Sequence, residues 1–123
     1  MPIHIAILIL SSLVLTGCAK PLTLVLPKEK PLELAIYSHG SLKQECTIAP
    51  GSSQFSQLEV LLVTNRDNWE PTLVTFAPAI LVTGSDFSIN FLQDFVVVNY
   101  ARGQFKHPMA KSTHAFLGCG NGT

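Results

Sequence analysis

Residues 87-FSINFLQDFVVVNYA-101 contain the clearest strand pattern in this chain. In its first part, apolar residues alternate with Ser88 and Asn90, which is the period of two expected of a half-buried strand. The polar residues 93 and 94 then interrupt the pattern as a turn does. Residues 95–101 follow as a second strand that is largely apolar on both faces, so we expect it to lie inside a sheet. The stretch therefore predicts two consecutive strands joined by a turn, the second of them central in an antiparallel sheet.

A second hairpin is predicted upstream. Leu32–Ser38 alternates with the same period of two. Gly40 tolerates a positive φ and makes a plausible turn with His39. Residues 42–48 return as the partner strand, and the Ala-Pro-Gly-Ser sequence of residues 49–52 ends the pattern.

Three shorter β-type runs complete the predicted sheet. They are residues 72–76, 79–83 and 104–106, with Pro78 between the first two. Residues 107–110 are expected to form a loop.

The only good helix candidate lies in residues 52–69. Its apolar side chains recur at helical spacing, at Phe55, Leu58, Leu61 and Leu62. The candidate caps are Ser52, Ser53 and Ser56, the last with Glu59 at capping-box spacing. Because Val and Thr favour strands, a buried strand over residues 58–64 is the rival interpretation. We favour the helix, which Pro71 prevents from continuing.

These elements predict an α+β fold, a small antiparallel sheet of about five to seven strands with one helix packed on one face. We place the globular domain at residues 32–119 and a frayed tail at residues 120–123. The 123 residues are 47% hydrophobic and 13% charged, which suits one core and excludes a wholly disordered chain. Eight Lys and Arg balance eight Asp and Glu, and this zero net charge gives no support for nucleic-acid binding.

The N-terminal residues read as a secretory leader. No charged residue precedes Lys20. The apolar run in residues 5–15 is shorter than the about 20 residues of a membrane-spanning helix but has the length of a signal-peptide core. We therefore predict a signal peptide at residues 1–17, with an uncleaved anchor or a buried strand as the alternatives.

The leader ends in Leu15, Thr16, Gly17 and Cys18, which resembles the lipobox of bacterial lipoproteins. The resemblance implies that the Cys18 thiol is alkylated by a diacylglycerol group, that the bond after Gly17 is cut, and that the new amino group is acylated. Several acyl chains anchor a protein stably where one does not. In that family an Asp after the cysteine favours the inner membrane, so Ala19 implies the outer membrane.

Residues 18–31 are predicted as a lipidated tether, since they hold three prolines and three lysines. The apolar residues 22–26 suit a tether poorly. They could instead form a first edge strand closed by Pro27.

Three cysteines leave an odd thiol to explain in an exported protein. Lipidation of Cys18 leaves Cys46 and Cys119, which could pair in an oxidising periplasm. A disulfide closing a loop of that length stabilises a domain by about 4 kcal/mol in the chain-entropy model. Two separate buried thiols are the alternative.

No catalytic, cofactor or metal motif stands out. The sequence contains no G-x-S-x-G, P-loop, G-x-G-x-x-G or C-x-x-C, and no histidine pair at helical spacing. A zinc site from His107, His114 and Cys119 is conceivable, but we read the histidines as solvated loop residues. Asp86 and Asp94 are read as turn residues. We predict no catalytic residues, no metal and no cofactor.

One segment has the composition of a recognition site. Arg66, Asp67, Asn68 and Trp69 combine an aromatic residue with polar neighbours, and Trp and Arg are favoured interface anchors. A lone Trp in a small domain is more often in the core. We predict these four residues as a possible partner-binding site.

By elimination, the sequence predicts a membrane-anchored, periplasm-facing lipoprotein with a small non-enzymatic binding or structural domain. Its expected partners are the lipid membrane, through acylated Cys18, and a protein or envelope component. One alternative is an inhibitor or immunity protein against an envelope hydrolase or toxin, acting through a loop such as residues 38–42 or 66–69. Another is a small envelope hydrolase that uses His39, His107, Asp86 and Asp94.

Overall fold

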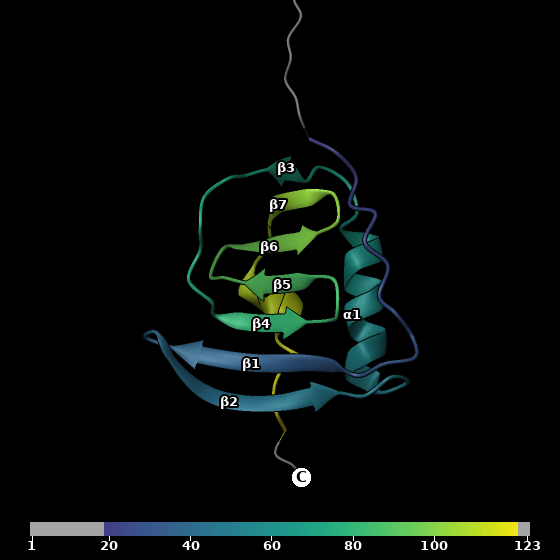
Figure 1. The fold of residues 1–123 in the computed structure, drawn as a ribbon, viewed down its shortest axis with the longest axis vertical. Coiled ribbons are helices and arrows are strands. Elements are labelled where there is room, and N and C mark those ends of the chain that lie inside the picture. Colours follow the sequence, from purple (N-terminus) through teal and green to yellow (C-terminus); the bar gives the residue numbers. More distant parts are fainter. Residues whose placement is uncertain (1–18, 121–123) are drawn as a thin grey trace, which may run out of the picture.

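The computed structural model describes residues 19–120, and the predicted leader, Cys18 and most of the predicted frayed tail lie outside this range. It has an α+β fold with seven antiparallel strands in the order β2-β1-β4-β5-β6-β7-β3 and one α-helix against one face, as the sequence predicts (Figure 1). The strands are β1 (Leu32–Ser38), β2 (Ser41–Ile48), β3 (Glu70–Pro71), β4 (Ile80–Thr83), β5 (Ser88–Phe91), β6 (Phe95–Tyr100) and β7 (Gly103–Pro108). The helices are α1 (Ser53–Thr64) and the short 3-10 helix η1 (Lys111–His114).

The hairpin of β5 and β6 lies inside the sheet, and the apolar pattern predicted this position for β6. Ile89 pairs with Val98, and β7 covers the other edge of β6. Continuing the same register, one apolar row runs from strand to strand on the face that packs against the helices. Its members are Leu34, Val82, Ile89, Val98 and Phe105. This row forms the middle of the core.

The upstream hairpin also forms as predicted. Its two turn residues, His39 and Gly40, have φ angles of 54° and 81°. Two positive φ values in a two-residue loop match the right-handed twist of the flanking strands. The hairpin extends past the rest of the sheet at one side (Figure 1).

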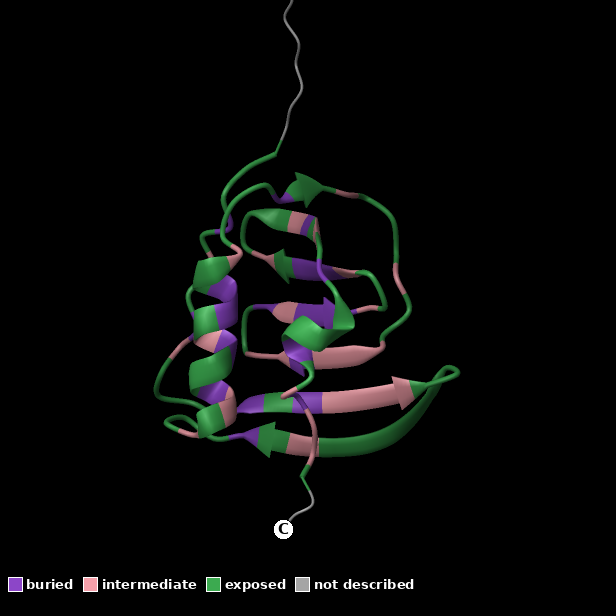
Figure 2. Ribbon diagram, turned by 180° about the vertical axis from the view of Figure 1, so that it is seen from behind, coloured by how far each residue is buried: buried purple, intermediate pink, exposed green. Residues whose placement is uncertain are grey.

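Helix α1 confirms the helical interpretation over the rival strand. The Ser52 hydroxyl caps it by accepting a hydrogen bond from the Phe55 backbone N–H at 3.2 Å. The helix runs across the strand direction and turns its buried side toward the sheet (Figure 2). That side carries the predicted residues Phe55, Leu58, Leu61 and Leu62. A helix is favoured over a strand here because helical spacing brings all four of these side chains to the core on one face.

The predicted strand at residues 72–76 is wrong. Pro71 lies opposite Phe105 and β7 begins at Gly103, so pairing ends soon after the Thr72 N–H donates to the Gln104 carbonyl at 3.0 Å, and the chain then passes to β4. Side chains of the sheet also hold this segment. Gln104 Nε2 donates to the carbonyls of Thr72 and Val74 at 3.0 and 2.7 Å, and Asn90 Nδ2 donates to the carbonyl of Ala77 at 3.0 Å. The loop predicted from residue 107 is also corrected, because β7 includes residues 107 and 108.

The domain begins earlier than the predicted boundary at residue 32. Leu22 and Leu26 are buried in the same core as the sheet and α1. Residues 21–31 form no strand, so the edge-strand alternative is wrong as well. Burying two leucines outweighs the flexibility suggested by the flanking prolines and lysines. Within the described residues, no helix is both long and apolar enough to cross a membrane.

Candidate functional site

The predicted recognition segment does not expose its tryptophan. Trp69 is fully buried and belongs to the core. Its indole N–H donates to the carbonyl of Asn65 at 2.6 Å, and its ring stacks on the His107 ring at a centroid distance of 4.9 Å. The partner-binding prediction is therefore wrong for Trp69, whereas Arg66, Asp67 and Asn68 are exposed.

The same segment binds the N-terminal end of the described chain. Lys20 and Trp69 exchange two backbone hydrogen bonds, each 2.8 Å long, as an isolated antiparallel bridge. The N–H of Leu22 donates to the carbonyl of Arg66 at 2.7 Å. Asn68, with φ of 69°, makes the bend that presents these backbone groups. Residues 66–69 thus fix the chain only two residues after Cys18.

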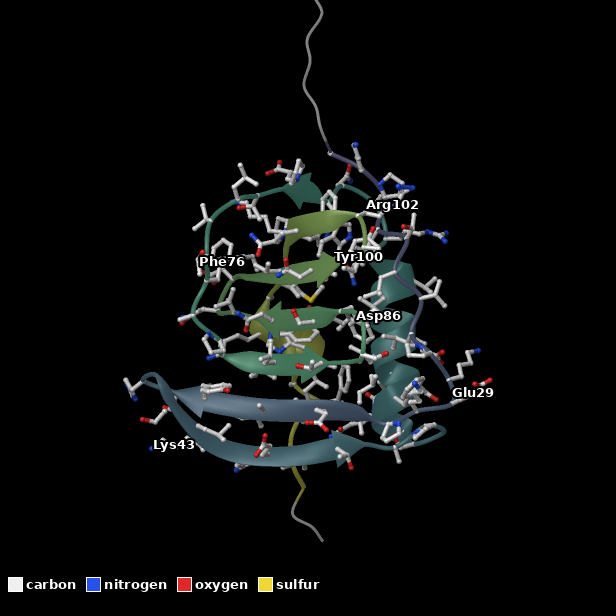
Figure 3. The ribbon with its side chains drawn as sticks, in the orientation of Figure 1. Glu29, Lys43, Phe76, Asp86, Tyr100 and Arg102 are labelled. Carbon is white, nitrogen blue, oxygen red and sulfur yellow. A yellow bond between two sulfur atoms is a disulfide. The ribbon has the colours of Figure 1, made fainter. Side chains whose placement is uncertain are left out.

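Further hydrogen bonds hold Thr23, the residue after Leu22. The N–H of Thr23 donates to the Tyr100 hydroxyl at 3.1 Å, and the Thr23 hydroxyl lies 3.1 Å from the same oxygen. Arg102 Nε donates to the Thr23 hydroxyl at 3.2 Å. Figure 3 shows Tyr100 and Arg102 beside the N-terminal segment. No local pattern in the sequence signals these contacts, which join residues more than 75 positions apart.

Basic side chains are exposed around this docking point. Lys20, Arg66 and Arg102 are all exposed. Within residues 19–120 the single ion pair joins Lys28 and Glu59, so these three cations have no carboxylate within 4.0 Å there. The nearby acids in sequence are Asp67 and Glu70, and Glu70 faces Lys106 across β3 and β7. This end of the domain can therefore offer charge to an external anion.

The predicted disulfide is present. Cys46 on β2 is bonded to Cys119, with their Cα atoms 5.7 Å apart. Gln54 of α1 supports the same C-terminal segment by donating to the carbonyls of Phe116 and Gly118 at 3.1 and 2.7 Å. With both sulfurs bonded to each other, neither can act as a nucleophile or a metal ligand.

The three described histidines occupy different environments. His39 lies exposed in the turn after β1, and His107 is half-buried against Trp69. His114 is buried beside Phe91, with 4.8 Å between ring centroids, and neither of its ring nitrogens has a hydrogen-bond partner. Burial lowers the pKa of His114, and the positive charge of Lys111 acts in the same direction. Reading His114 as a solvated residue is therefore wrong.

No metal centre assembles in the part of the chain that the structure describes, where no three candidate ligands come together. Cys119 is committed to the disulfide, which removes the conceivable site with His107 and His114. Asp86 and Asp94 are both exposed in turns, as predicted.

An apolar strip follows the solvent side of α1. Val60 and Val63, one helical turn apart, are 63% and 62% exposed, and Val25 of the N-terminal segment is 78% exposed. Shallow hollows flank the two helix valines, one lined by Leu61 and Phe116 and the other by Val25 and Leu62. We call Val25, Val60 and Val63 the valine strip. Clustered exposed apolar residues of this kind mark interaction surfaces.

Comparison with known proteins gives no relative. No protein-family model matches the chain, and no curated protein or solved structure is significantly similar to it.

Proposed function

We propose that this chain is a lipoprotein of the bacterial cell envelope, anchored in the outer membrane and facing the periplasm. In this proposal residues 1–17 are removed, Cys18 carries the acyl chains, and the folded domain is a non-enzymatic binding module. The observation that carries the proposal is the disulfide between Cys46 and Cys119.

The disulfide supports the proposal in two ways. Such bonds persist in oxidising compartments such as the periplasm and are rare in the cytosol. The bond also accounts for two of the three cysteines, so Cys18 is the one thiol left for another chemistry. That thiol sits at the end of the lipobox-like sequence.

Expression of the whole chain in a bacterium tests the anchor. The intact mass of membrane-fraction protein should correspond to a chain that begins at acylated Cys18. The Cys18→Ser variant should keep its leader and gain no lipid, whereas the adjacent control Ala19→Ser should be processed normally. Wild-type protein recovered from the cytosol with its leader attached and no lipid would overturn the proposal.

The valine strip is the surface that we propose for a protein partner. Val60 and Val63 lie on the side of α1 away from the core, Val25 lies beside Val63 on the N-terminal segment, and each of the three exposes more than half of its surface. A partner would bury apolar area there at about 25 cal/mol per Å². Charged residues within the strip would therefore oppose binding.

Affinity capture from envelope extract tests the strip. The lipidated wild-type protein should enrich a specific partner, identified by mass spectrometry. The double variant Val60→Glu/Val63→Glu should lose that partner, whereas Thr47→Glu, which adds a charge at an exposed position of β2, should keep it. Equal capture by all three proteins would contradict the assignment of the strip.

The second candidate function is an inhibitor or immunity protein, and the β1–β2 turn favours it. His39 and Gly40 form a well-defined two-residue turn, and Leu42 beside it is 47% exposed. A preorganised projecting loop binds an enzyme cleft at low entropic cost. Leu42→Asp should then abolish a 1:1 complex with the target enzyme, while the Val60→Glu/Val63→Glu variant should leave the complex intact.

A further inference from the structure

We infer that the lipid anchor holds the domain in one orientation, with the β3 edge of the sheet against the lipid headgroups and the β2 edge facing away from the membrane. This inference rests on the proposed acylation of Cys18. The membrane-facing surface consists of Lys20, Arg66, Arg102 and the neighbouring β3 edge.

The short connection between the anchor and the domain is the first reason. Lys20 is fixed by its two backbone hydrogen bonds to Trp69, and Leu22 by its bond to Arg66. Only Ala19 separates Lys20 from Cys18. Two residues span at most about 7 Å between Cα atoms. An acylated Cys18 therefore brings Lys20 to the membrane surface, with no flexible tether between them.

The position of this docking point in the sheet sets the orientation. Trp69 immediately precedes β3, which is the last strand at one edge, and β2 is the last strand at the other. Six spacings of about 4.8 Å separate the two edges, or about 29 Å in total. In Figure 1 the N-terminal segment enters at the β3 end, and the β1–β2 hairpin lies at the opposite end.

Charge complementarity agrees with this placement. Lys20, Arg66 and Arg102 surround the docking point and have no carboxylate within 4.0 Å among the described residues. Asp67 is the one acid in the loop beside them, whereas Glu70 and Asp94 lie next to Lys106. Headgroup phosphates attract such a basic surface. In this orientation the axis of α1 points away from the membrane surface, from the β3 edge toward the β2 edge (Figure 1). The valine strip therefore remains accessible to a partner.

Energy transfer from the lipidated full chain to a membrane-bound acceptor measures the orientation. Asp67 and Lys43 are both exposed, the first beside the docking point and the second on β2. In Asp67→Cys and Lys43→Cys the introduced thiol is the only reactive one, because Cys18 is alkylated and Cys46 is bonded to Cys119. Each variant is labelled with a donor dye and reconstituted in phosphatidylethanolamine–phosphatidylglycerol vesicles that contain an acceptor lipid.

We expect strong energy transfer from position 67 and much weaker transfer from position 43. Co-flotation with the vesicles in a density gradient shows that the protein is membrane-bound. Equal transfer from both positions in such membrane-bound protein overturns the inference and leaves the proposed function standing. Protein that carries no lipid by mass spectrometry and does not float overturns the proposed function and the inference together.

A linker insertion provides the matched control. A Gly-Ser linker of about ten residues between Ala19 and Lys20 adds a root-mean-square reach of about 17 Å and leaves both the anchor and the domain intact. The difference between positions 67 and 43 should then largely disappear. If the difference persists unchanged, the short connection does not set the orientation, and the inference fails.

Discussion

At the scale of single residues, His114 is the clearest source of pH dependence. Its imidazole is buried against Phe91 without a hydrogen-bond partner for either nitrogen. Burial disfavours the charged imidazolium and lowers the pKa of His114 in the folded state below its ordinary value of 6.5. In mild acid, His114 is therefore protonated more readily in the unfolded chain than in the folded domain.

The expected result is a loss of stability in mild acid. Because the pKa of His114 is lower in the folded state, the free energy of unfolding should be highest above pH 6.5 and should fall as the pH drops through the folded-state pKa. Urea unfolding at a series of pH values measures this slope. His114→Leu should flatten it, whereas Ser112→Ala in the same 3-10 helix should retain it. An unchanged slope in His114→Leu would assign the acid sensitivity elsewhere.

Gly84 is a second residue whose identity the packing dictates. The ring of Phe87 occupies the space where a Cβ atom at Gly84 would lie. Gly84→Ala should therefore destabilise the domain by about 1–3 kcal/mol, the usual cost of overpacking. Gly118→Ala is the matched control, because a Cβ there meets open space. Similar unfolding midpoints for the two variants in urea would contradict this account.

At the scale of elements, the N-terminal segment behaves as part of the core and not as a tether. It has no regular secondary structure, yet Leu22 and Leu26 pack with α1 and the sheet. Its backbone is anchored at Lys20 and Leu22 by hydrogen bonds to residues 66–69. The segment and the loop that follows α1 therefore form one unit.

Leu26→Ala tests this conclusion. Truncating a buried leucine should lower the free energy of unfolding by about 2–5 kcal/mol. The neighbouring Val25→Ala, at a position that is 78% exposed, should change it by no more than about 0.5 kcal/mol. Chemical denaturation of the two variants gives the comparison. If Leu26→Ala is as stable as the wild type, the segment does not contribute to the core in solution.

At the scale of the whole molecule, the disulfide joins the C-terminal segment to the β2 edge. Cys46 and Cys119 are 73 residues apart in sequence, and η1 lies between β7 and the bond. The bond thus closes a loop that contains α1 and most of the sheet. A small domain whose total stability is about 5–15 kcal/mol depends strongly on such a link.

Reduction of the disulfide should lower the free energy of unfolding by about 4 kcal/mol in the chain-entropy model. Unfolding in urea with and without a thiol reductant measures the difference. The double variant Cys46→Ala/Cys119→Ala should match the reduced wild-type protein and should not respond to the reductant. A wild-type curve that reductant does not shift would show that the bond contributes little.

The local elements of this protein follow from short-range patterns in its sequence. The alternation in residues 87–101 and in Leu32–Ser38, the turn at Gly40 and the helical spacing of Phe55, Leu58 and Leu61 each depend on neighbours a few positions away. The cysteine count also led to the correct pair. Periodicity and turn chemistry are short-range properties, so a single sequence reports them directly.

The assembled fold sets the roles of Trp69, Leu22, His114 and residues 72–76. In sequence Trp69 could be either an interface anchor or a core residue, and the fold buries it with its backbone bridged to Lys20 and its ring stacked on His107. Residues 72–76 have strand-forming composition, but in the observed register β7 begins at Gly103, so only Thr72 of this segment still bonds to its backbone. These outcomes depend on which surfaces meet across 30 to 80 residues of chain, as in the contacts of Gln104 with Val74 and of Arg102 with Thr23. Local composition carries no record of such long-range contacts, because shape and hydrogen-bond complementarity exist only once the sheet is assembled.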